Sequence, residues 1–68
     1  MLRGEDLRAV ADGLTRLPRR QREVLVLRYY LDLSEAEIAS TLGISNGSVK
    51  SHSSCGLSAL ARHLEGRT

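Results

Sequence analysis

Five polar or small residues recur along residues 46–54 with the spacing of one helix face. If Val49 points into a core, a helix carries these five residues on its opposite side. Asparagine can pair with adenine and lysine with guanine, serine hydroxyls can bond base edges, and glycine permits close approach. The segment therefore predicts hydrogen bonding to DNA bases. The candidate base-contacting residues are Asn46, Gly47, Lys50, Ser51 and Ser54.

A second group of candidates could bind DNA phosphates. Arginines cluster from Arg16 to Arg22, and no acid follows them until Glu23. Phosphate contacts hold a protein on the duplex without reading its sequence. For each arginine the alternative is a solvated side chain paired with a neighbouring acid, and for His52 it is a partly packed surface position. The candidate phosphate-contacting residues are Arg19, Arg20, Arg22, Ser45 and His52.

Two short helices joined by a turn are expected to position these residues, as a helix-turn-helix over about residues 34–64. Ser34 and Glu37 have the spacing of a capping box at the start of the first of these helices. Gly43 follows its last apolar residue and favours its end, and Ser45 then caps a helix from Asn46 to about Leu64. The residues expected to pack the two helices together are Ile38, Ala39, Leu42, Ile44 and Val49.

Two further helices are expected before residue 34. The first runs from about Glu5 to Thr15, and Gly13 weakens its end. Pro18 favours the start of the second, from Arg19 to about Leu31, before a short turn at Asp32-Leu33. The apolar stripes comprise Leu7, Val10, Ala11 and Leu14 in the first helix, Val24, Leu25, Leu27, Arg28 and Leu31 in the second, and Leu57, Leu60 and Leu64 in the last.

Four residues carry individual expectations. Gly56 marks a close helix crossing, and Arg28 pairs with an acid such as Glu37. His63 is expected to be inert, since it lies near a frayed end. Cys55 is expected to be a half-buried thiol rather than a redox sensor.

Length and composition bound the fold and the chemistry. The length of 68 residues suggests a single domain over residues 1–68. Its expected fold is all-α, a four-helix domain that contains the helix-turn-helix. Its three-helix core is expected to be like that of winged-helix proteins, but without a wing. One cysteine excludes an intramolecular disulfide, and no His and Cys cluster has zinc spacing. We therefore expect no metal, no cofactor, no catalytic residues and no small-molecule substrate.

Charge and targeting signals bound the partners. The net charge of +2 is mild for a nucleic-acid binder, but acids and arginines are segregated along the chain. No signal peptide, membrane span or lipidation signal is present, so a cytoplasmic location without membrane contact is expected. The predicted partner is double-stranded DNA.

A family resemblance rests on several segments together. These are Leu17-Pro18, Arg22 to Leu25, Leu27 to Tyr30, Leu33 to Ala39, Leu42 to Ser45 and Gly47 to His52. The chain resembles region 4 of bacterial sigma-70 family sigma factors over about Leu14 to Leu60, and is most similar to the extracytoplasmic-function (SigE-like) group. Cys55 departs from the pattern, because related sequences commonly have arginine there.

The resemblance implies a function and partners. It implies recognition of the −35 promoter element and docking on the β flap of the RNA polymerase core, with an anti-sigma factor as a further partner by family analogy. It also implies a longer natural chain, because the sigma domain for the −10 element is missing. Two alternatives remain open: a DNA-binding domain of LuxR-type response regulators, and an interaction module that binds polymerase or an anti-sigma factor with little DNA affinity.

Overall fold

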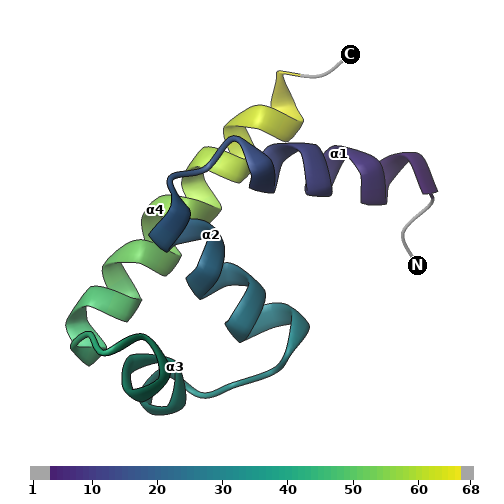
Figure 1. The fold of residues 1–68 in the computed structure, drawn as a ribbon. Coiled ribbons are helices and arrows are strands. Elements are labelled where there is room, and N and C mark those ends of the chain that lie inside the picture. The colour runs from purple at the N-terminus through teal and green to yellow at the C-terminus, as the bar shows by residue number, and fades with distance from the viewer. Residues whose placement is uncertain (1–3, 67–68) are drawn as a thin grey trace.

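Four α-helices and one π-helical segment occur in residues 4–66. They are α1 (Gly4–Thr15), α2 (Arg19–Leu25), η1 (Val26–Tyr30), α3 (Glu35–Leu42) and α4 (Asn46–Glu65). The computed structural model describes residues 4–66, except for the side chains of Glu5 and Asp6. The long helix α4 is the common partner, since α1, α2 and α3 each pack against it (Figure 1). No strand occurs within residues 4–66, so the expected all-α fold is confirmed.

The core lies where α2, α3 and α4 meet. Val24, Ile38 and Val49 are fully buried there, one from each helix, and Ala39 joins them. Complete burial of such a side chain contributes about 1.5–3 kcal/mol. The expected packing of the helix-turn-helix is therefore confirmed. Leu27, Leu33, Leu42 and Ile44 pack around this core.

Local hydrogen bonds begin and end α3 and begin α4 where the sequence predicts. The Ser34 hydroxyl accepts the Glu37 backbone N–H at 3.1 Å, and the Glu37 carboxylate accepts the Ser34 N–H at 2.9 Å. The bonds from Ser34 hold the pKa of the Glu37 carboxyl below its ordinary value. Gly43 ends α3 with a left-handed φ of 69°, and the Ser45 hydroxyl caps α4.

The expected second helix is not α-helical to its end. Beyond Leu25 the chain widens into η1, where the Leu31 N–H bonds the Val26 carbonyl five residues back, at 3.1 Å. The Leu33 N–H reaches the Leu27 carbonyl at 3.0 Å, and between them Asp32 takes a left-handed φ of 58°. The predicted helix from Arg19 to about Leu31 is therefore present as far as Tyr30, but its second part is π-helical.

The wider turn of η1 changes which apolar residues are buried. Leu31 was assigned to the buried stripe, yet it is 54% exposed. Tyr29 and Tyr30 are 59% and 83% exposed. The Arg28 guanidinium lies over the Tyr29 ring, 5.9 Å from its centroid, while Glu37 is bonded to its own cap. The expected Arg28–Glu37 pair is therefore not formed.

Helix α1 is attached to the second half of α4 through Gly13. A Cβ at Gly13 would contact Leu60 Cδ1 and lie 2.9 Å from the His63 ring, so glycine permits this crossing. The His63 Nε2 also lies 3.2 Å from a carboxylate oxygen of Asp12. Gly13 thus has a packing role that its helix propensity does not indicate, and His63 packs against α1.

Two expected apolar stripes are only partly buried. In α1, Val10 and Leu14 are half-buried, whereas Leu7 and Ala11 are exposed. In α4, Leu57 is 41% exposed. The buried position beside it is Gly56, where a Cβ would lie 3.0 Å from Leu25 Cδ1 and 3.5 Å from Gln21 Cβ. The close crossing predicted at Gly56 is therefore confirmed, and α2 is the crossing helix.

Candidate DNA-binding surface

The exposed face of α4 brings the five base-contact candidates together. Each is exposed, and Val49 and Gly56 are buried on the other side of the same helix. Gly47, Ser51 and Ser54 lie on the side of α4 opposite the two buried residues, and Lys50 lies on the flank of the helix. Asn46 is exposed in the first turn, although it is only three residues before Val49. This face comprises Asn46, Gly47, Lys50, Ser51 and Ser54.

Lys50 is the charged group of this face. No other lysine or arginine occurs between Asn46 and Ala61. Among residues 4–66, no acid with a described side chain lies within ion-pair distance of its ammonium group. Lys50 is therefore available for a guanine or a phosphate.

The three candidate arginines lie at the start of α2, which crosses α4 beside Gly56. Two of them are already paired within the helix. Arg19 and Arg20 bond the two carboxylate oxygens of Glu23, at 3.2 and 3.3 Å. Pairing with a neighbouring acid was the alternative expected for each arginine, and the i+3 and i+4 spacing to Glu23 is the specific signal for it. Arg22 is half-buried and lies outside this set of pairs.

Ser45 and His52 are placed less favourably for phosphates. The Ser45 hydroxyl accepts the Ser48 backbone N–H and donates to the Ser48 hydroxyl, both at 3.0 Å. A phosphate would have to compete with these bonds. His52 lies three residues after Val49 and four before Gly56, so it shares their packed side of α4 and is half-buried.

Cys55 is exposed, and the expectation of a half-buried thiol is wrong. It lies one turn after Ser51, at the border of the exposed face. A side chain at this position can therefore reach outward from α4.

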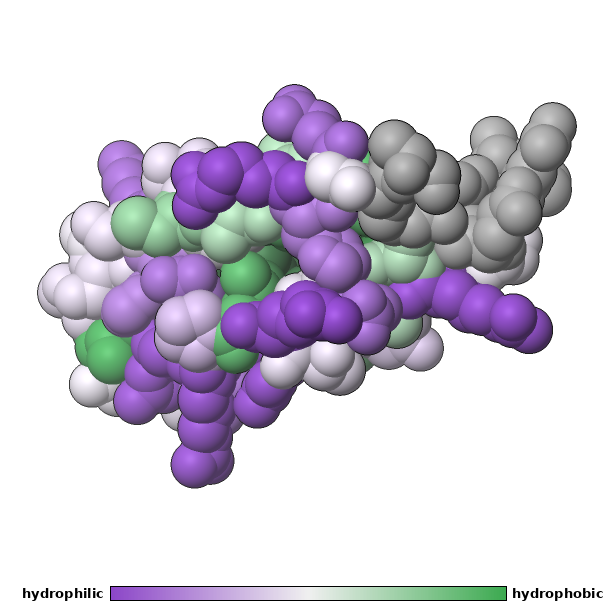
Figure 2. Space-filling view, turned by 90° about the horizontal axis from the view of Figure 1, so that it is seen from above, coloured by the Kyte–Doolittle hydropathy of each residue, from purple (hydrophilic) through white to green (hydrophobic). Residues whose placement is uncertain are grey.

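A second surface was not found by the sequence analysis. An apolar groove of about 550 Å³ opens between α1 and the end of α2 with η1. The pair Tyr29-Tyr30 was the available signal, but its exposure follows from the π-helical turn. Figure 2 shows hydrophobic surface in separate patches between projecting hydrophilic side chains. The groove is lined by Val10, Leu14, Leu25, Val26, Tyr29 and Tyr30.

Other kinds of site are not found in the described part of the chain. Within it, no three His, Cys, Asp or Glu side chains gather where they could hold a metal ion. No helix in residues 4–66 is long and apolar enough to cross a membrane.

The family comparison agrees with this geometry. A family model described as sigma-70, region 4 matches residues 7–60, which include most of α1, all of α2, η1 and α3, and the part of α4 that carries the exposed face. A search of curated proteins finds no match. This family is non-enzymatic, and it recognises the −35 promoter element in transcription initiation. The chain belongs to the sigma-70 region 4 family.

Proposed function

We propose that residues 1–68 form a single region 4 domain that reads the −35 element with the exposed face of α4. The observation that carries the proposal is that five polar or small residues of α4 are all exposed, whereas Val49 and Gly56 of the same helix are buried. A recognition helix enters the major groove by its N-terminal part, so Asn46 and Lys50 are assigned to bases. Gly47 permits close approach there. Ser51 and Ser54 extend the base contacts along the helix.

Phosphate contacts are assigned to the start of α2. Arg19, Arg20 and Arg22 supply positive charge beside α4, and Ser45 and His52 complete the proposed set. Arginine suits this role because its planar donors match the phosphate oxygens. These contacts would fix the register of α4 on the duplex without reading its sequence.

For RNA polymerase we propose the β flap as partner and the groove between α1 and η1 as its docking site. Tyr30 is 83% exposed, and apart from Tyr29 and Tyr30 every residue that lines the groove is aliphatic. An apolar groove of this kind suits the apolar face of a short helix. An anti-sigma factor covering the same groove would block polymerase binding. The finer assignment to the extracytoplasmic-function, SigE-like group and a cytoplasmic location complete the proposal.

A second function is favoured by a specific observation. Glu23 pairs with two of the three arginines, and Cys55 stands where a cation could lie on the border of the proposed DNA face. A domain with so little available positive charge could serve as an interaction module for polymerase or an anti-sigma factor, with weak DNA binding.

An amide chemical-shift titration distinguishes the two functions. The domain is titrated with a flap-tip peptide in one sample and duplex DNA in another. We expect the flap to shift residues of α1 and η1, and DNA to shift residues 46–54. A flap response without a DNA response would favour the interaction module, and DNA shifts without a flap response would remove the docking assignment. Tyr30→Ala should weaken flap binding, whereas Leu57→Ala, at an exposed apolar residue outside the groove, should not.

A further inference from the structure

Glu23 lies at the centre of the arginine cluster on α2. Its Oε2 is 3.2 Å from Arg19 Nε, and its Oε1 is 3.3 Å from Arg20 Nη1. Each carboxylate oxygen therefore accepts from a different arginine. The Arg19 side chain is 83% exposed and that of Glu23 is 30% exposed, so the pairs lie at the protein surface.

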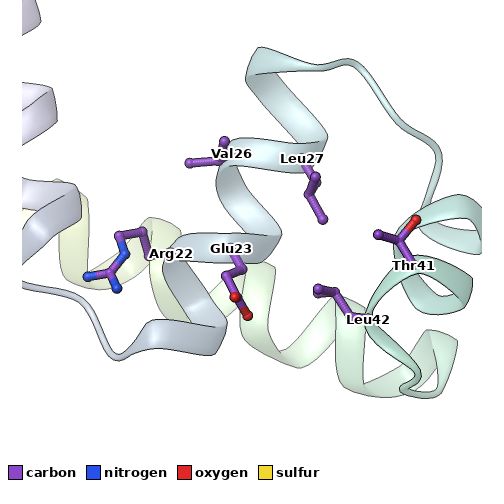
Figure 3. A pocket seen from close by; sticks show the side chains of 6 residues that line it. All are labelled: Arg22, Glu23, Val26, Leu27, Thr41 and Leu42. Carbon is purple, nitrogen blue, oxygen red and sulfur yellow. The ribbon is translucent and has the colours of Figure 1, made fainter.

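Arg22 does not take part in this arrangement. Figure 3 shows the Arg22 guanidinium and the Glu23 carboxylate directed apart along α2. Both residues line a hollow of about 340 Å³ between α2 with η1 on one side and α3 on the other, together with Leu27 and Leu42. The carboxylate thus acts on Arg19 and Arg20 in particular.

We propose that Glu23 is a built-in competitor for DNA phosphates, which holds Arg19 and Arg20 in the free domain and so limits its affinity for duplex DNA. Carboxylate and phosphate oxygens accept hydrogen bonds from the same guanidinium donors. A phosphate must therefore displace Glu23 or share the arginines with it. The inference rests on the proposed role of these arginines as phosphate contacts.

The two ion pairs are weak, so Glu23 lowers the affinity for DNA without preventing binding. Exposed ion pairs are weak, because solvent screens them and ordering two long side chains costs entropy. Two such pairs correspond to a change in DNA affinity of about two- to ten-fold. Because the phosphate contacts carry no sequence information, affinities for all duplexes should change by a similar factor.

The test is Glu23→Gln, with binding to a random-sequence duplex measured by fluorescence anisotropy at about 0.1 M salt. We expect about two- to ten-fold tighter binding. Glu65→Gln is the matched control, because it makes the same change of charge at the far end of α4, about 22 Å along the helix from Lys50. An equal gain in both variants would mean that net charge alone acts, and would overturn the inference.

A second pair of variants separates this inference from the proposed function. In an Arg19→Ala, Arg20→Ala background, Glu23→Gln should give no more gain than Glu65→Gln. If the two alanines leave DNA binding unchanged, the phosphate role itself fails. If they weaken binding but Glu23→Gln gives no gain beyond the control, only the competitor role fails. Should Glu23→Gln not fold, Glu23→Ala carries the same expectation, and circular dichroism checks the helix content of each variant.

Discussion

Lys50 and Arg20 carry the same charge but lie in different surroundings. Lys50 stands on the exposed face of α4, whereas Arg20 is paired with Glu23 at the start of α2. On a duplex selected from a randomised library, Lys50→Ala should lose about 1–3 kcal/mol of discrimination against a shuffled duplex. Arg20→Ala should weaken binding to both duplexes about equally. Equal losses on both duplexes for Lys50→Ala would remove its base-reading role.

Cys55 offers a test of how far the DNA surface extends along α4. Its side chain is exposed one turn after Ser51, so an arginine there could reach a phosphate. Cys55→Arg should therefore strengthen binding to promoter and shuffled duplexes alike, while Cys55→Ser should change neither. Anisotropy titrations of both variants check this. An affinity of the arginine variant equal to that of the serine variant would place position 55 off the DNA.

At the scale of single helices, α4 contains two glycines with opposite roles. A Cβ at Gly47 would approach only Ser45 Oγ, at 3.9 Å, whereas at Gly56 it would press on buried Leu25. Gly47→Ala should stabilise the fold by up to about 1 kcal/mol through helix propensity. Gly56→Ala should destabilise it by about 1 kcal/mol net, because overpacking exceeds the same gain. Urea unfolding measures both, and a stabilised Gly56→Ala would contradict the close crossing.

Gly47 also links helix stability to DNA. The fold gives no packing reason for glycine at this position. If the DNA backbone or a base edge comes close there, Gly47→Ala should bind DNA more weakly although its fold is more stable. A more stable fold together with weaker DNA binding would show that glycine at this position lowers helix stability but favours DNA binding.

The capping box makes the start of α3 sensitive to acid. Its hydrogen bonds lower the pKa of Glu37 in the folded state, so the stabilisation is fully present above the unfolded pKa. It is lost as the pH falls through the folded pKa. Thermal unfolding followed from neutral into acid pH should therefore show a smaller acid loss for Glu37→Gln than for the unchanged chain. Glu35→Gln, next to the cap residue, serves as control and should leave the contribution of Glu37 in place.

At the scale of the whole molecule, two surfaces are proposed to bind different partners. The proposed DNA face belongs to α4 and α2, whereas the apolar groove, proposed for the flap, belongs to α1, the end of α2 and η1. The arrangement separates an electrostatic function from an apolar one. DNA and the flap should therefore respond differently to salt.

Three to four phosphate contacts predict a log–log slope of about −3 for DNA affinity against salt concentration. Flap binding should vary little over the same range, because burial of apolar surface does not depend on screening. Titrations from about 0.05 to 0.2 M salt measure both slopes. A flat DNA response would favour the interaction module.

Helix ends that are set by residues close together in the chain could be predicted without the structure. Ser34, Glu37, Gly43 and Ser45 were sufficient for both ends of α3 and the start of α4, because caps act through hydrogen bonds and backbone preferences within a few residues. The period of Ile38, Ala39 and Val49 likewise predicted the core of the helix-turn-helix and hence the side of α4 that remains exposed. The family resemblance followed from the same segments and is confirmed by the match over residues 7–60.

The packing of helices, the apolar groove and the pairing of the arginines could not be predicted, because they depend on the three-dimensional arrangement of the chain. The packing role of Gly13 depends on Leu60 and His63, which lie about fifty residues further along the chain. The groove depends on the π-helical turn, in which a backbone N–H bonds the carbonyl five residues back. The sequence did not predict this turn, because the same apolar residues also suit an α-helix. Whether Arg19 and Arg20 are paired depends on the rotamer of Glu23. Their spacing along the helix permits an ion pair, but the arrangement of the side chains decides whether the pair forms.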